Sequence, residues 1–171
     1  MKSDTQKLSD LCIFADGRVS CADLNLDNYI STKNMLPNKN GITRSAGLPT
    51  VPQALAYQKM DVLVSNIRPY FRKIWFADRN GGCSNGVLVF RALEHCYSNF
   101  LYYALSDNNF FDYATSTSKG TTMPCGDKKA IMDYDVPKLP LPAQIAISEI
   151  LSSLDAKIML NKRINDYLAA A

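Results

Sequence analysis

The stretch that decides the fold is the C-terminal segment Leu139–Ala171, which reads LPLPAQIAISEILSSLDAKIMLNKRINDYLAAA. It begins with Pro140 and Pro142, and proline suits a helix only at its first turn because it lacks an amide hydrogen. From Ala143 onward there is neither glycine nor proline, so the segment predicts a helix of about 25 residues and about 40 Å. That length exceeds the width of a small domain, so part of the helix must project or contact a second partner.

The apolar residues of this helix follow alternating four- and three-residue steps, which is the seam of a coiled coil. Two seam positions are asparagines, which lower stability but fix register and partner number. The alternative is an amphipathic helix that only caps its own domain. We predict a dimer and partner interface made of Ile147, Leu151, Leu154, Ile158, Asn161, Ile164, Asn165 and Leu168.

This helix resembles the conserved helix of the specificity subunits of type I restriction-modification systems. The family usually has glutamate before the glutamine Gln144, where this chain has Ala143. This departure is a surface-type change. The resemblance is carried by Pro140-Leu141-Pro142, Gln144-Ile145-Ala146, Leu151, Leu154-Asp155, Ile158, Asn161, Ile164 and Asn165.

The preceding part of the chain predicts one α+β (α/β mixed) domain with a mixed or antiparallel twisted sheet. At 171 residues and 47% hydrophobic, the chain can bury one sizeable core. We place this recognition domain at residues 1–139 and the helix at residues 140–171. We expect a turn at residues 80–82, long polar loops at 37–52 and 115–124, strands at 28–36, 61–67, 73–77, 86–90 and within 131–139, and helices at 98–105 and 109–115.

The middle of the chain also resembles this family, in its target-recognition domains. The resemblance implies a half-length specificity subunit, because a full-length subunit has two recognition domains and two conserved helices where this chain has one of each. The landmarks are Asp61-Val62-Leu63, Ser65, Ile67-Arg68-Pro69, Cys83-Ser84, Gly120-Thr121-Thr122 and Val136-Pro137-Lys138-Leu139-Pro140.

Positive charge is concentrated between Asn28 and Ala77. That window holds seven lysines and arginines and one acid, Asp61, for a net charge of +6 against +3 for the whole chain. A field of one sign suits a phosphate backbone, and an ordinary solvated surface is the alternative.

Several side chains in and near this window suit DNA. Phosphate contacts position a protein, whereas base contacts specify sequence, with arginine suited to guanine and asparagine to adenine. Tyr70, Phe71 and Trp75 are interpreted as core aromatics, with base stacking as the alternative. The predicted DNA-binding residues are Lys33, Asn34, Lys39, Arg44, Arg68, Arg72, Lys73, Lys119, Thr121 and Thr122.

We find no catalytic motif in the sequence. The run from Asn66 to Tyr70 lacks the paired prolines with which an adenine methyltransferase holds a flipped base, and no glycine-rich nucleotide loop occurs. Asp133, Asp135 and Lys138 approach a nuclease set only in composition. We therefore expect a non-catalytic chain.

The cysteines and the N-terminal segment point to the cytoplasm. The first ten residues are polar, and no apolar run approaches the ~18 residues of a membrane span. Five widely spaced cysteines without a signal peptide are expected to be reduced thiols. We expect no metal site; a zinc site from Cys83, His95 and Cys96 is an alternative that lacks the usual ligand spacing.

The resemblance implies sequence-specific recognition of double-stranded DNA by a homodimer with a bipartite target. Methylation and cleavage would belong to a methyltransferase subunit and, where present, a restriction subunit. S-adenosylmethionine would be bound by the methyltransferase, and no cofactor by this chain. Two alternatives remain open: a DNA-independent protein that occupies or regulates methyltransferase subunits, and a small DNA-modifying enzyme fragment.

Overall fold

The centre of the fold is the antiparallel pair of β6 (Val62–Ser65) and β9 (Val87–Ala92), in a computed structural model that describes residues 4–170. Strands β2 (Cys12–Phe14) and β7 (Ile74–Phe76) extend this sheet in the order β2-β9-β6-β7. Successive side chains of a strand point to opposite faces. Both faces of the central strands β6 and β9 are buried, which explains their unbroken apolar runs.

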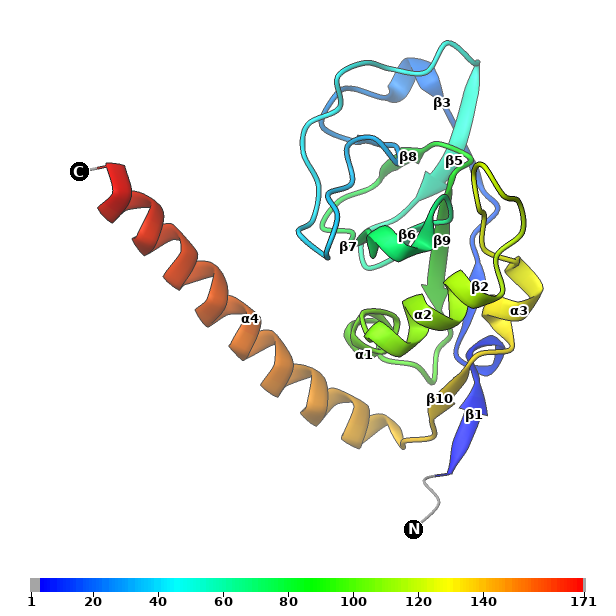
Figure 1. Ribbon diagram of the computed structural model, residues 1–171, viewed down its shortest axis with the longest axis vertical. Coiled ribbons are helices and arrows are strands. Elements are labelled where there is room, and N and C mark those ends of the chain that lie inside the picture. Colours follow the sequence, from blue (N-terminus) through cyan, green and yellow to red (C-terminus); the bar gives the residue numbers. More distant parts are fainter. Residues whose placement is uncertain (1–3, 171) are drawn as a thin grey trace.

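Helices cover one face of the central sheet (Figure 1). Val62 and Val64 of β6 belong to a core cluster that includes side chains of these helices. The Asp107 carboxylate accepts a hydrogen bond from Asn109 N and so caps the second helix. The helices are α1 (Ser98–Leu105), α2 (Asn108–Ser116) and α3 (Lys128–Met132).

A second four-stranded sheet packs on the other face. A second core cluster lies between the two sheets, and it contains Leu63 of β6 together with Tyr57 and Cys83. The strand order of the second sheet is β3-β5-β8-β4, and its pairs are antiparallel except for the parallel pair of β8 and β4. Its strands are β3 (Arg18–Ser20), β4 (Tyr29–Ile30), β5 (Gln53–Tyr57) and β8 (Gly81–Cys83).

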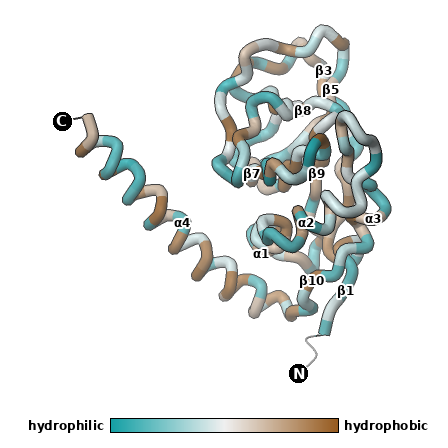
Figure 2. The backbone as a smooth tube through the Cα atoms, in the orientation of Figure 1, coloured by the Kyte–Doolittle hydropathy of each residue, from teal (hydrophilic) through white to brown (hydrophobic). Residues whose placement is uncertain are grey.

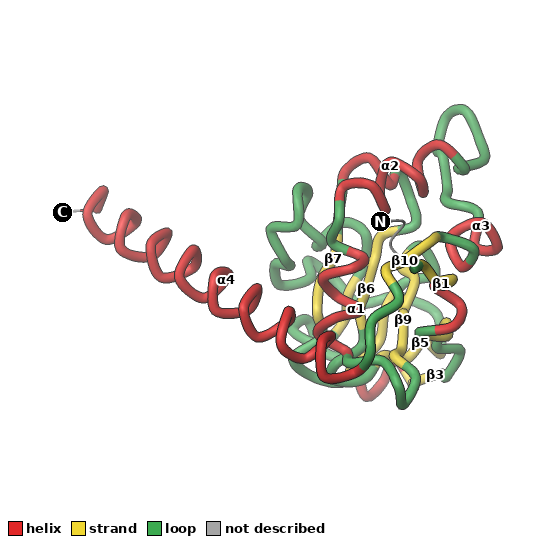
Figure 3. Tube along the Cα trace, turned by 90° about the horizontal axis from the view of Figure 1, so that it is seen from below, coloured by secondary structure: helices red, strands yellow, loops and turns green. Residues whose placement is uncertain are grey.

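The long helix α4 (Leu141–Ala170) leaves the domain directly after a small two-stranded sheet of β1 (Thr5–Lys7) and β10 (Asp135–Pro137). It packs against α1 and then projects away from the domain (Figure 3). No helix within residues 4–170 is long and apolar enough to cross a membrane. Short 3-10 turns complete the described elements: η1 (Leu8–Asp10), η2 (Cys21–Asp23) and η3 (Pro69–Phe71).

The α+β class, the antiparallel and mixed sheets and the long C-terminal helix are confirmed, and the helix has 30 residues instead of about 25. The domain limits stay predictions, since the first turns of α4 pack on the domain and the predicted ends at Met1 and Ala171 lie outside the described residues. The predicted strands at residues 61–67, 73–77 and 86–90 and the two predicted helices are present.

Two local predictions are wrong. The strand expected at 28–36 ends at Ile30, because Asn34 Oδ1 accepts Ser31 N at 2.6 Å and closes a turn. The turn expected at 80–82 is instead the start of β8, where a Cβ on Gly81 would lie 2.1 Å from the Asn28 carbonyl oxygen. The strand expected within 131–139 is present as β10, after the end of α3.

Candidate nucleic-acid interface

The turn after β6 presents two predicted DNA-binding arginines on either side of η3. Arg68 and Arg72 both have left-handed backbone, with φ of +51° and +52°. Residues other than glycine avoid this region, so contacts outside the turn must hold it. One such contact comes from α2, where Asp112 accepts a hydrogen bond from Arg72 Nη2 at 3.3 Å.

The loop that precedes β5 packs directly on this turn. Asn38 N donates to the Phe71 carbonyl at 2.9 Å, and Lys39 N donates to the Arg72 carbonyl at 2.8 Å. The Lys39 ammonium donates to the Ser106 carbonyl at 2.9 Å, between α1 and α2. Lys39 therefore joins the loop to the helices and has less of its charge available for a ligand.

Lys73 links the same turn to the loop that carries Lys33. Its Nζ donates to the Thr32 carbonyl at 2.7 Å and lies 5.8 Å from the centroid of the Phe71 ring. Burial lowers the pKa of Lys73 from its ordinary value. Lys33, the next residue after Thr32, is exposed. The turn and this loop thus form one continuous surface.

The second polar loop lies on the other side of Arg68. Arg68 N donates to the Pro124 carbonyl at 2.8 Å, so the loop is attached to the turn. Lys119 is paired with Asp127, and hydrogen bonding to Lys119 holds the pKa of that carboxyl below its usual range. The exposed hydroxyl residues of this loop are Thr121 and Thr122.

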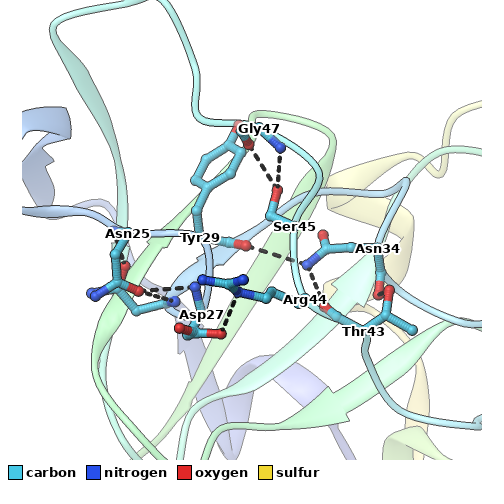
Figure 4. Close-up of polar contacts among 9 residues, drawn as sticks. Asn25, Asp27, Tyr29, Asn34, Thr43, Arg44, Ser45 and Gly47 are labelled. Carbon is cyan, nitrogen blue, oxygen red and sulfur yellow. Dashed lines mark hydrogen bonds and ion pairs between the residues drawn. The ribbon is translucent and has the colours of Figure 1, made fainter.

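A pocket of about 610 Å³ opens between the loop at residues 31–34 and the loop at residues 43–49. Arg44 stands at this pocket, where its Nε donates to Asp27 at 3.0 Å (Figure 4). Hydroxyls and cations together suit phosphate oxygens. The polar lining includes Ser31, Thr32, Lys33, Thr43, Arg44 and Ser84.

The predicted DNA-binding residue Asn34 is buried and hydrogen-bonded within the protein, and its DNA contact stays a prediction. The residue is 5% exposed, and its amide nitrogen donates to the Tyr29 carbonyl at 3.3 Å and the Thr43 carbonyl at 2.9 Å. Its side-chain oxygen accepts from Ser31. Figure 4 shows the side chain between the two pocket loops. Asn34 thus shapes the pocket and does not offer its amide to a ligand.

The other predicted DNA-binding residues lie on connected segments, but their side chains are not equally free to bind a ligand. Arg44, Arg72 and Lys119 are each paired with a carboxylate. Among the contacts of residues 4–170, no hydrogen bond or ion pair engages the side chain of Lys33 or Arg68. These two side chains are the most available cations of the surface, and their DNA contacts stay predictions.

The first turns of α4 are fixed to the domain by a buried glutamine. Gln144 is 2% exposed, its Oε1 accepts from Tyr97 N at 2.9 Å, and its Nε2 donates to the Leu139 carbonyl at 2.9 Å. Further along, the Tyr103 hydroxyl donates to Asp155 at 2.9 Å. The helix is therefore anchored only over its first half.

The rest of α4 leaves its predicted interface in solvent. Every residue from 153 to 170 is exposed, and Figure 2 shows apolar and polar patches alternating along this part of the helix. Leu151 is half-buried. The dimer interface therefore stays a prediction. The other predicted interface residues, all exposed, are Ile147, Leu154, Ile158, Asn161, Ile164, Asn165 and Leu168.

The alternative zinc site does not form in the described part of the chain. Cys83 and Cys96 belong to different core clusters. Burial raises the pKa of Cys83 to about 12 and that of Cys96 to about 11, which disfavours the thiolate that binds zinc. Among residues 4–170, no three His, Cys, Asp or Glu side chains gather as a metal-ligand group.

Comparison with known protein families gives a match over nearly the whole chain. The family described as the type I restriction modification DNA specificity domain matches residues 2–170. The chain belongs to this type I DNA specificity family. A curated relative, the type I restriction enzyme EcoDI specificity subunit of Escherichia coli, is 29% identical over 109 residues, which cover 63% of this chain and 24% of the relative.

Solved structures of specificity subunits share the fold of this family member. The HsdS subunit from Thermoanaerobacter tengcongensis gives a TM-score of 0.68 at 18% identity, over 94% of this chain and 44% of that one. A chain from a study of type I R-M complex assembly and conformational transition gives 0.72 at 20% identity, over 94% and 44%. The S subunit from M. genitalium gives 0.60 at 16% identity, over 91% and 40%. The chain therefore spans less than half the length of these relatives.

Sequence reasoning missed an aromatic pair at the centre of this specificity-domain surface. Tyr70 is 48% exposed and Phe71 is 39% exposed, so their interpretation as core aromatics is wrong. Trp75 is half-buried and packs edge-on against Tyr57 with ring centroids 5.7 Å apart. The sequence held one local signal of this exposure. Pro69 and the arginines on either side of the pair disfavour a regular strand that would bury the two rings.

Proposed function

We propose that this chain is a target-recognition unit of a type I specificity subunit that binds double-stranded DNA. The observation that carries the proposal is the convergence of three segments: the loop with Lys33, the turn from Arg68 to Lys73, and the loop with Thr121. Cations and hydroxyls from separate loops on a rigid scaffold are what recognition of a duplex requires. Membership of the DNA specificity family supports the same function.

The chain supplies recognition and not chemistry in this proposal. A partner methyltransferase subunit carries S-adenosylmethionine and modifies the DNA, and a restriction subunit joins where the system has one. The exposed stripe of α4 supports docking of such partners and of a second copy of this chain. One solved structure with this fold comes from a study of complex assembly of the type I R-M system, which is in keeping with such docking. A cytoplasmic location follows from this role.

The decisive test is the salt dependence of DNA binding by the Arg68→Ala variant. Each phosphate contact contributes about 0.9 to the slope of log affinity against log salt. We expect the wild-type chain to bind a labelled mixed-sequence duplex with a steep slope, measured by fluorescence anisotropy. Arg68→Ala should reduce that slope by about one unit.

The matched control is Lys59→Ala. Lys59 is also exposed and basic, but it precedes β6 whereas Arg68 follows it, so the two lie at opposite ends of the same strand. Its slope should equal that of the wild type. A wild-type chain that binds purified methyltransferase subunit but no duplex at any salt concentration would support the DNA-independent alternative.

A further inference from the structure

Two adjacent aromatic side chains project from the middle of the proposed DNA-binding surface. Tyr70 and Phe71 are 48% and 39% exposed, and their ring centroids lie 4.7 Å apart at an interplanar angle of 53°. Exposed apolar surface that is contiguous normally marks an interface. The two adjacent rings therefore indicate a binding site for another molecule.

The backbone that carries the pair is held on both sides. Arg68 N donates to the Pro124 carbonyl, while the carbonyls of Phe71 and Arg72 accept from the loop that contains Asn38. In Figure 1 this short green helical turn lies between that loop and the yellow loop near residue 120. The left-handed conformations on either side of the turn persist because these contacts impose them. The rings are thus presented on a rigid turn.

The charges beside the rings favour nucleic acid over protein as the occupant. Arg68 and Arg72 bracket the aromatic pair, and the Lys73 ammonium lies 5.8 Å from the Phe71 ring centroid. Apolar side chains next to cations match a base step between two phosphates. Proteins that bend DNA insert apolar wedges of this kind between neighbouring base pairs.

We propose that Tyr70 and Phe71 form an aromatic wedge that enters a groove of the bound duplex and partly unstacks one base step. This inference rests on the proposed function and adds a specificity element to it. Pyrimidine–purine steps unstack most easily, so the wedge selects such a step without hydrogen bonding to its bases.

The test uses a duplex that the wild-type chain itself recovers from a randomised pool. A single mismatch is then placed at each position of that duplex in turn, and affinity is measured by anisotropy. Mismatches at directly read pairs should weaken binding by about tenfold, whereas a mismatch at the wedge step should tighten it by about tenfold because the unstacking is already done. The double variant Tyr70→Ser/Phe71→Ser should lose only this gain and keep the salt slope.

Two further variants guard against a folding defect. Tyr70→Ser alone changes the more exposed ring and should lose most of the gain, with an unchanged unfolding midpoint. Ile13→Ser removes an equally exposed apolar side chain on β2 and should keep the wild-type mismatch profile.

Each other result overturns the wedge in a recognisable way. Recovery of no duplex by the wild type removes the proposed function together with the wedge. A mismatch profile without a tightening position, or one that the double variant shares, removes the wedge and leaves the proposed function standing. Unchanged DNA binding with lost capture of a purified methyltransferase subunit would assign the aromatic pair to a protein partner instead.

Discussion

Asp61 is the acid at the centre of the basic window, and it serves the core. It is 3% exposed and accepts from Arg91 through both carboxylate oxygens, at 2.9 and 2.7 Å. The positive charge of the surface is instead reduced by acids from outside the window, since Asp27 and Asp112 form ion pairs with two of its arginines. The net charge of a sequence window therefore overstated the field on the surface.

Met60 offers a test of backbone strain away from the DNA-binding surface. It has a φ of +73° and is 42% exposed, so glycine relieves an unfavourable conformation and removes little packing. We expect Met60→Gly to be about 1 kcal/mol more stable than Met60→Ala, measured by urea denaturation. The alanine variant is the control because it keeps the left-handed penalty, and equal stability of the two variants would contradict this account.

At the scale of elements, the strands that could be predicted are those whose apolar sequence pattern matches their burial in the fold. The runs of β6 and β9 are apolar because each strand contributes to both cores. The small strands of the second sheet had no such signal: β8 contains Gly81 and Gly82, where a Cβ would clash with neighbouring backbone and side chains. For the aromatic pair Tyr70 and Phe71 the sequence indicated only that no regular strand would bury it, since its full exposure depends on which loops meet at η3.

The junction of α4 with the domain depends on Gln144. Replacing it with alanine leaves Tyr97 N and the Leu139 carbonyl without their partner inside the protein. We expect Gln144→Ala to lower the free energy of unfolding by about 1–3 kcal/mol in chemical denaturation. Glu149→Ala, at an exposed position of the same helix, is the control and should change stability little. Equal stability of the two variants would mean that the hydrogen bonds of Gln144 contribute little to holding the helix on the domain.

At the scale of the whole molecule, the projecting half of α4 predicts self-association. The seam residues Leu154 and Ile158 are 47% and 52% exposed, and an isologous contact lets the same stripe serve both copies. We expect light scattering at micromolar concentration to give about twice the 19.0 kDa of one chain. Leu154→Asp should give the single-chain mass, whereas Lys157→Asp, which introduces the same carboxylate and the larger change of charge at a polar exposed position, should remain paired. A monomeric wild type would remove the homodimer from the proposal.

The small sheet of β1 and β10 has a consequence for how two copies could be joined. Lys138 N donates to the Asp4 carbonyl at 2.8 Å, so the beginning of the described chain lies beside the beginning of α4. If two helices pair antiparallel along their full length, Ala170 of one copy lies level with Leu141 of the other, and hence near that copy's Asp4. A short linker can then fuse the copies head to tail into one polypeptide, with a domain at each end of a two-helix rod and no change to either fold.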